Sequence, residues 1–142
     1  MTASSRAAVA RRLFEPAGVA ALAACGCAAV WLGDPTVPGG PFPVCPVKAL
    51  LGIDCPGCGS LRMLYCLLHG DLWAAVRFNA LGLVAVVLLV WAYVAWTYGR
   101  LAGRRILSWQ HYRWAAPVTL VLALAWFVVR NLGFGPFPAL YV

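Results

Sequence analysis

The chain has 142 residues, of which 63% are hydrophobic and 11% charged, whereas soluble domains are roughly 45–50% apolar and about 25% charged. This composition excludes an ordinary soluble globular protein. The formal net charge of +7 does not indicate nucleic acid, because the basic residues interrupt apolar runs instead of gathering on a polar surface. A lipid bilayer is the expected partner, and the length allows one domain with three spans of about 20 residues each and a single sizeable loop.

The hydropathy pattern predicts an all-α membrane protein with three transmembrane helices and a short interfacial or re-entrant helix after a cysteine-rich outer loop. In chain order, the predicted segments are a basic N-terminus (1–16), a first span (17–33), an outer loop (34–79), a second span (80–99), a basic loop (100–113), a third span (114–129) and an apolar tail (130–142). The N-terminus and the basic loop carry seven arginines. Because basic residues in short loops stay in the cytoplasm, we expect a multi-pass protein of the inner membrane with its cysteine-rich loop outside.

The first span has two competing interpretations. Arg11-Arg12 resembles a twin-arginine export signal, and the run before Cys25 resembles a lipoprotein cleavage site. Glu15-Pro16 interrupts the apolar region that such signals need, so we expect an uncleaved span in which Cys25 and Cys27 pack as small apolar residues. Small residues on one face of this span suit packing within the chain, against a membrane protein partner or against a second copy.

The outer loop opens with DPTVPGGPFP (34–43), whose four prolines and two glycines forbid a helix and favour extended turns. Cys45, Cys55 and Cys58 follow within fourteen residues. Pro56-Gly57 predicts a tight turn between the last two cysteines. The loop therefore presents three thiols beyond a stiff connector.

Capping residues mark the helices that follow the thiols. Gly59 leads into a helical pattern of leucines, and Gly70 suits its C-cap. Asp71 then caps a short interfacial helix, and Asn79 opens the second span. This layout places Cys58 near a helix N-terminus, where exposed amides favour its thiolate.

Helical periodicity places three further polar or reactive side chains on the same face as Cys58. Arg62, Cys66 and His69 follow Cys58 at positions i+4, i+8 and i+11. Arg62 would further favour the thiolate, and Cys66 with His69 are candidate metal ligands one turn apart. Arg62 itself needs a partner among apolar neighbours, and Asp54, Asp71 or a lipid phosphate would serve.

Four interpretations of the loop cysteines remain open. A disulfide between any two of Cys45, Cys55 and Cys58 suits an oxidising location and would pin the loop. A zinc site would take these three with Cys66 or His69, although the second CxxC of a specific zinc motif is missing. A redox-active CxxC fits the helix start, but no thioredoxin-like βαβ pattern surrounds it. Simple packing cysteines are the fourth interpretation.

One set of residues forms a recognisable pattern: Cys45, GIDCPGCG at 52–59, Arg62, HGD at 69–71, Ala75, Asn79 and Arg130-Asn131. The pattern resembles the small bacterial membrane proteins catalogued as domain of unknown function 2752. This resemblance implies a small integral membrane protein and implies no activity. It also suggests that the apolar tail folds back on the cysteine loop, so that Arg62 and Arg130, both candidates for binding an anion or a lipid headgroup, lie beside the thiols.

The chain has few side chains suited to acid–base catalysis. It has four acidic residues, two histidines and no carboxylate pair within a span. We therefore expect an accessory or scaffold subunit with a cysteine-pinned extracytoplasmic loop. A membrane thiol–disulfide or zinc-dependent activity at the outer face is the alternative, and lipid or small-molecule transport as an oligomer is a third hypothesis. Transport has the least support, because three spans form a transporter only by oligomerising and no broken-helix repeat is visible.

Overall fold

The computed structural model describes residues 3–37, 39–43, 45–104 and 106–132, with side chains from residue 13 onward. Its elements, in chain order, are α1 (Ala3–Gly33), α2 (Pro46–Leu51), α3 (Ser60–Leu68), α4 (Leu72–Ala102), the 3-10 turn η1 (Trp109–His111) and α5 (Ala115–Asn131). No strand occurs in the described ranges, which agrees with the predicted all-helical class.

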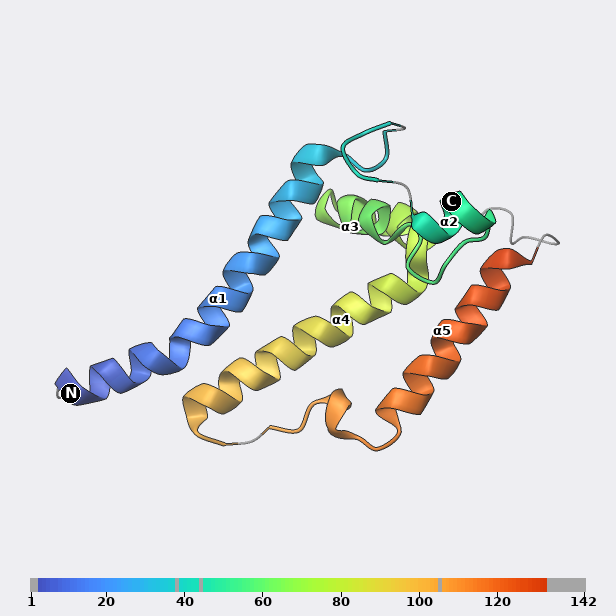
Figure 1. Cartoon of the computed structure of the whole chain (residues 1–142). Helices are drawn as coiled ribbons and strands as arrows, with labels where there is room; N and C mark the ends of the chain where they lie inside the picture. The colour runs from blue at the N-terminus through green and yellow to red at the C-terminus, as the bar shows by residue number, and fades with distance from the viewer. Residues whose placement is uncertain (1–2, 38, 44, 105, 133–142) are drawn as a thin grey trace.

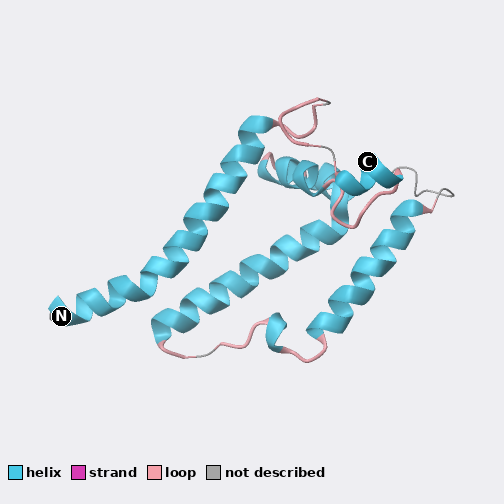
Figure 2. Ribbon diagram, in the orientation of Figure 1, coloured by secondary structure: helices cyan, strands magenta, loops and turns pink. Residues whose placement is uncertain are grey.

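The three long helices run as an up-and-down set (Figure 1). Helices α1 and α5 run in one direction, α4 runs in the opposite direction between them, and the loop that contains η1 joins α4 to α5 at one end. At the other end, α1 stops, α4 begins and α5 stops, and the short helices α2 and α3 gather there with the loops of Figure 2. We call this end the head and define it as residues 34–79 with Arg130 and Asn131.

Two helical segments are long and apolar enough to cross a membrane. They are Leu13–Gly33, with 21 residues and a mean hydropathy of 1.7, and Leu72–Ala102, with 31 residues and a mean hydropathy of 2.2. Only 11% and 17% of their most apolar windows are buried, whereas the core helix of a soluble protein would be mostly covered. Helix α5 is apolar but shorter, with 17 residues, so length and composition support two of the three predicted spans.

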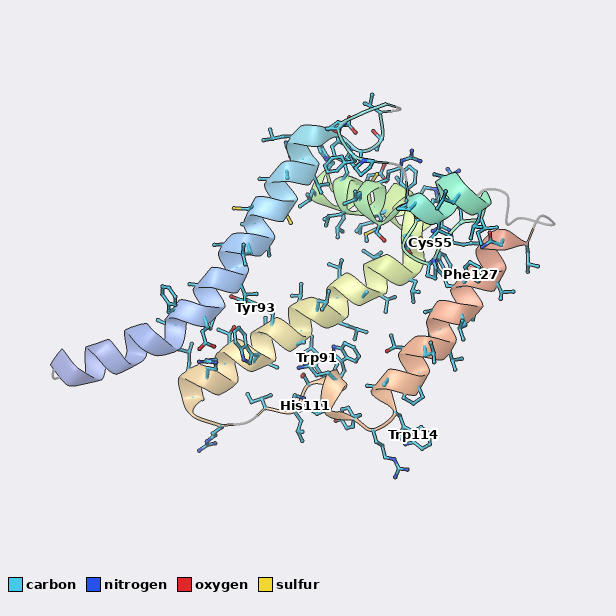
Figure 3. All side chains as sticks on the ribbon, viewed as in Figure 1. Cys55, Trp91, Tyr93, His111, Trp114 and Phe127 are labelled. Atoms are coloured by element: carbon cyan, nitrogen blue, oxygen red, sulfur yellow. The ribbon has the colours of Figure 1, made fainter. Side chains whose placement is uncertain are left out.

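Helix α1 begins well before the predicted start of the first span. It runs through Pro16, which the sequence pattern placed at a helix start. The carbonyl of Pro16 accepts a hydrogen bond of 3.0 Å from the hydroxyl of Tyr93, which Figure 3 shows on α4 where this helix faces α1. This contact joins α1 to α4 at the end away from the head.

Helix α4 contains the break that the sequence predicts. Asn79 has non-helical backbone angles (φ −162°, ψ 89°), and its side-chain oxygen accepts the amide of Gly82 at 2.8 Å, as an N-cap residue does. Asp71 caps the first part of the helix in the same way, by accepting the amide of Ala74 at 2.9 Å. A short helix before Asn79 and a long one after it therefore meet at a kink.

The end of α3 also matches the prediction. Gly70 has φ +79°, and its amide bonds to the carbonyl of Leu67 at 3.1 Å, while the amide of Asp71 bonds to the carbonyl of Cys66 at 2.9 Å. This pair of bonds is a Schellman motif, which requires a left-handed residue and so favours glycine. It reverses the chain so that α3 packs on the first part of α4 around Met63, Cys66 and Ala75.

Helix α2 was missed in the sequence, where the whole of 34–79 before the CPGCG turn was expected to be loop. It has six residues, starts with Pro46 at its first position and ends at Gly52. So short a helix leaves little hydrophobic periodicity to detect. Its position matters, because Cys45 is its N-cap residue.

Candidate metal and thiol centre

Three cysteine sulfurs converge in the head. Cys45 precedes α2, and Cys55 and Cys58 flank a tight turn that is closed by a 3.0 Å bond from the amide of Cys58 to the carbonyl of Cys55. The Sγ atoms of Cys45 and Cys55 are 3.5 Å apart, and those of Cys55 and Cys58 are 3.2 Å apart. All three sulfurs lie within 4.8 Å of one another. We call Cys45, Cys55 and Cys58 the sulfur cluster.

The sulfur cluster is not cross-linked. A disulfide needs an S–S distance of about 2.05 Å, and the separations of 3.2 and 3.5 Å are well beyond it. All six cysteines of the chain lie within the described residues, and all are free thiols. A pinning disulfide is therefore absent from this structure, although the sulfurs are close enough for one to form after a small movement.

Within the sulfur cluster, the thiol that ionises most readily is that of Cys45 and not that of Cys58. The backbone amide of Lys48, followed by the thiols of Cys55 and Cys58, lowers the pKa of Cys45 to about 7. Burial, followed by the neighbouring thiols, raises the pKa of Cys58 to about 12. The prediction that Cys58 ionises was wrong, because α3 starts two residues later at Ser60 and because Cys58 is only 5% exposed.

Helices α4 and α5 both bind the CPGC turn through buried side chains. The Nδ2 group of Asn79 donates to the carbonyl of Pro56 at 3.0 Å, to that of Cys58 at 3.3 Å and to the hydroxyl of Ser60 at 3.0 Å. Arg130, at the end of α5, donates from Nη1 to the same Cys58 carbonyl at 2.6 Å. The amide of Cys55 donates to the sulfur of Cys58 at 3.2 Å. The turn that carries two of the sulfurs is thus fixed from two long helices.

Asp54 is the charged centre of the head. Its side chain is fully buried, with Lys48 Nζ 3.1 Å from Oδ1 and Arg130 Nη2 3.9 Å from Oδ2. The side chain of Asn131 accepts from the backbone amide of Asp54 at 3.0 Å and donates to its carbonyl at 2.8 Å. The sequence prediction considered Asp54 only as a partner of Arg62. The sequence feature that points to Asp54 is its position directly before the CPGCG motif, as one of only four acidic residues in the chain.

Cys66 and His69 do not join the sulfur cluster. Cys66 packs in the small core of the head, and burial, followed by the charges of Asp71 and Asp34, raises the pKa of its thiol. His69 bonds through Nδ1 to the carbonyl of Tyr65 at 2.9 Å and stacks on Trp31 with ring centres 4.0 Å apart. Neither residue belongs to the group of ligand atoms that lie within 4.8 Å of one another.

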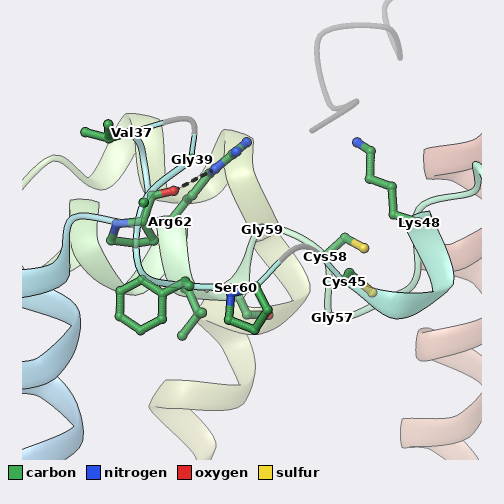
Figure 4. Close-up of a pocket in the computed structure, with 14 residues that line it drawn as sticks. Val37, Gly39, Cys45, Lys48, Gly57, Cys58, Gly59, Ser60 and Arg62 are labelled. Atoms are coloured by element: carbon green, nitrogen blue, oxygen red, sulfur yellow. Dashed lines mark hydrogen bonds between the residues drawn. The ribbon is translucent and has the colours of Figure 1, made fainter.

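The two candidate anion-binding arginines have different surroundings. Arg130 is 1% exposed and paired with Asp54, so this structure does not place it where a lipid headgroup would reach it. Arg62 is half-buried, and its Nε donates to the carbonyl of Pro35 at 3.1 Å. It lines a pocket of about 500 Å³, which also includes Cys45, Lys48 and Cys58 (Figure 4).

The proposed fold-back of the tail lies mostly outside the described residues, because 133–142 are not described. Its first two residues, Arg130 and Asn131, do meet the cysteine loop through Cys58 and Asp54. The expected gathering of Arg62, Arg130 and the cysteines at one end of the molecule is therefore visible in the described part.

Residues 45–93 match a family model described as "Protein of unknown function (DUF2752)". The matched segment contains the sulfur cluster, α3, the kink at Asn79 and much of α4. No curated protein and no solved structure matches the chain. The description of the family names no activity. The match over residues 45–93 supports the resemblance to the DUF2752 family.

Proposed function

We propose that this chain is an integral membrane scaffold protein whose head binds one zinc ion through Cys45, Cys55 and Cys58. The observation that carries the proposal is the convergence of three free sulfurs within 4.8 Å, from segments ten residues apart in the chain. Zinc bound by thiolates at about 2.3 Å in a tetrahedron separates its sulfurs by about 3.8 Å. The observed 3.2 and 3.5 Å need an expansion of only about half an ångström.

The charges of the head support a divalent ion. Three thiolates and one zinc ion carry a net charge of −1, and the buried carboxylate of Asp54 brings this to −2. Lys48 and Arg130, which both face Asp54, bring the total to zero. Buried charges are tolerated when they are compensated in this way. A monovalent ion on three thiolates would leave one negative charge without a counterpart.

A scaffold role follows from what surrounds the three sulfurs. Asn79 and Arg130 connect the CPGC turn to α4 and α5, so a bound metal ion would stiffen a head that already joins two long helices. The proposed topology has α1, α4 and α5 crossing the inner membrane. The basic N-terminus and the loop with Arg100, Arg104 and Arg113 lie in the cytoplasm, and the head lies outside. A membrane protein partner or a second copy would then dock on the lipid-facing helices or on the head.

Metal analysis of the full-length chain, purified in detergent without chelators, tests the zinc site. We expect about one zinc ion per chain in the wild type and a loss of most of it in Cys55→Ser. Cys25→Ser is the matched control, because this exposed cysteine of α1 is not part of the sulfur cluster and its removal should leave the zinc content unchanged. A wild-type chain that holds no zinc, even after zinc is added to the reduced protein, would contradict the proposal.

A second candidate function is thiol–disulfide exchange, which is favoured by the pKa of about 7 for Cys45 and by its 3.5 Å distance to Cys55. The Cys45 thiolate would attack a partner disulfide, form a mixed disulfide and release one partner thiolate. Cys55 would then attack the sulfur of Cys45 and release the second partner thiolate, so that two thiols of this chain are oxidised as one partner disulfide is reduced. Trapping of a mixed disulfide at Cys45 in Cys55→Ser, with a chain that lacks zinc, would favour this function over the first.

A further inference from the structure

The pocket beside the sulfur cluster has the charge and the lining of an anion site. It measures about 500 Å³, within the range of sites that hold small ligands. One wall is formed by connector residues Pro35, Val37, Gly39, Gly40, Phe42 and Pro43, and the CPGCG turn with the first turn of α3 forms the other. Lys48 and Arg62 are its cationic residues, Cys45 and Cys58 also line it, and no carboxylate does so within the described part of the chain. From this lining we propose that the pocket binds a phosphate group, held chiefly by Arg62.

Arg62 is oriented for this role. Its Nε is fixed by the carbonyl of Pro35 at 3.1 Å, which leaves both Nη groups of the guanidinium for a ligand. None of the four side-chain carboxylates, all in the described ranges, forms an ion pair with Arg62. Glu15 pairs with Arg100, and Asp54 pairs with Lys48 and Arg130. Asp34 accepts from the amide and hydroxyl of Thr36, and Asp71 caps α4. A planar guanidinium held at one nitrogen and open at two others matches the bidentate geometry of phosphate oxygens.

Lys48 adds the second positive charge. In Figure 4 the side chains of Arg62 and Lys48 rise on either side of the turn that carries Cys58, and both extend toward the same side of the pocket. The ion pair between Lys48 and Asp54 keeps the ammonium in place on its side of the pocket. Two cations on opposite sides suit a group with more than one charged oxygen. Phe42 and Pro43 offer an apolar wall for the organic part of a phosphate ester.

The same chemistry has two possible sources, a phospholipid headgroup and a soluble phosphate compound. The pocket lies at the end of the molecule where α1 and α5 stop and α4 starts, which is the level of the headgroups if these helices span the bilayer. Only the choice between a lipid headgroup and a soluble phosphate compound depends on the proposed membrane position. Phosphate binding does not require the metal ion, because Arg62 is not one of the proposed ligands.

Binding to the full-length chain tests the proposal with two probes. Native mass spectrometry measures phosphatidylglycerol retained from mixed micelles, with phosphatidylcholine as competitor, and calorimetry in detergent measures inorganic phosphate. We expect Arg62→Gln to weaken binding of the active probe about ten- to hundredfold, the usual loss for charge-assisted hydrogen bonds. Arg62→Lys, which keeps the charge but loses the planar fork, should fall between Arg62→Gln and the wild type.

Arg77→Gln is the matched control, since Arg77 is exposed on the first part of α4 and lies outside the pocket. It should bind as the wild type does. Retention of phosphatidylglycerol alone assigns the site to a lipid headgroup, and binding of inorganic phosphate assigns it to a soluble compound. Equal losses in Arg62→Gln and Arg77→Gln, or no binding of either probe to wild type, would overturn the proposal. Zinc content and thermal unfolding of the same samples separate this result from a failed metal site or a misfolded variant.

Discussion

The head and the three long helices bury different kinds of side chain. In the head, the largest fully buried side chains include Asp54, Asn79 and Arg130, and each is held by hydrogen bonds or ion pairs. Along the helices, the buried positions are small residues such as Ala92 and Ala95, while several leucine and valine side chains of α4 and α5, such as Val87, Leu89 and Val121, are more than half exposed. Charge and hydrogen bonding fix the head, and the helices present an apolar surface to their surroundings.

This difference is consistent with water around the head and a lipid bilayer around the long helices. An exposed apolar surface along two helices would cost free energy in water, but in hydrocarbon it is the favoured surface. A buried network of charged and amide groups, by contrast, requires nearly complete pairing in either medium. The head, which carries the sulfur cluster, is therefore the part of the molecule that cannot tolerate the loss of one polar partner.

Asp54→Asn should have the largest effect on stability. It leaves the guanidinium of Arg130 and the ammonium of Lys48 without their carboxylate, and removal of one partner of a buried ion pair costs about 3–5 kcal/mol. Chemical unfolding in detergent, followed by circular dichroism, measures the change. A loss within about 0.5 kcal/mol, the range expected for an ordinary surface substitution, would mean that the charges of the head do not hold it together.

The thiols of the head should differ from each other in reactivity. After zinc has been removed by a chelator, the alkylation rate of Cys45 should rise with pH and reach half its maximum near pH 7, because only the thiolate reacts and the pKa of this thiol is about 7. The pKa of Cys58 is about 12, so at pH 8 its thiolate fraction is lower by about a thousandfold or more. Peptide mass spectrometry after timed iodoacetamide treatment gives both rates.

The same reagent compares the head with a long helix. Cys25 is exposed on α1 in the isolated chain, but in a bilayer it should be shielded from a charged, membrane-impermeant maleimide that still labels Cys45. Equal labelling of both cysteines in vesicles open to the reagent on both sides would show that α1 faces water.

Asn79→Ala should destabilise the chain by about 2–3 kcal/mol, because it leaves the carbonyl of Pro56 and the amide of Gly82 without their partner and removes one of the two donors to the carbonyl of Cys58. The zinc content should fall with it, since the CPGC turn loses its link to α4. Thr119→Ala is a suitable control, because this exposed hydroxyl bonds only to the carbonyl of Ala115 in its own helix. If both variants unfold alike, the kink at Asn79 does not organise the head.

Tyr93→Phe should have the smallest effect. It removes one hydrogen bond between two long helices, from Tyr93 to the carbonyl of Pro16, and such bonds average about 0.6 kcal/mol in membrane proteins. The midpoint of thermal unfolding should hardly change. A loss as large as that of Asn79→Ala would mean that the long helices, too, depend on polar contacts.

Local signals predicted much of this architecture. Hydrophobic runs located α1, α4 and α5, Gly70 marked the end of α3, and Asn79 marked the break in α4, because each of these features depends on residues within one or two helical turns. The turn at Pro56-Gly57 was predictable for the same reason. The three cysteines were also identified as candidates from their spacing.

The errors arose where contacts join distant parts of the chain. Asp54 meets Arg130 and Asn131 across more than seventy residues, and no local pattern indicates that encounter. The ionisation of Cys58 was misjudged because burial, which depends on the fold, outweighs a nearby helix start. Cys66 and His69 were considered as further ligands, but Cys66 packs in the small core of the head and His69 contacts Tyr65 and Trp31.

X-ray absorption at the zinc edge of the purified chain tests most directly whether the sulfur cluster holds a zinc ion. We expect three sulfur neighbours at about 2.3 Å and one lighter atom at about 2.0 Å, with the sulfur signal lost in Cys55→Ser. Zinc surrounded only by nitrogen and oxygen, or a spectrum that is the same in wild type and Cys55→Ser, would contradict it.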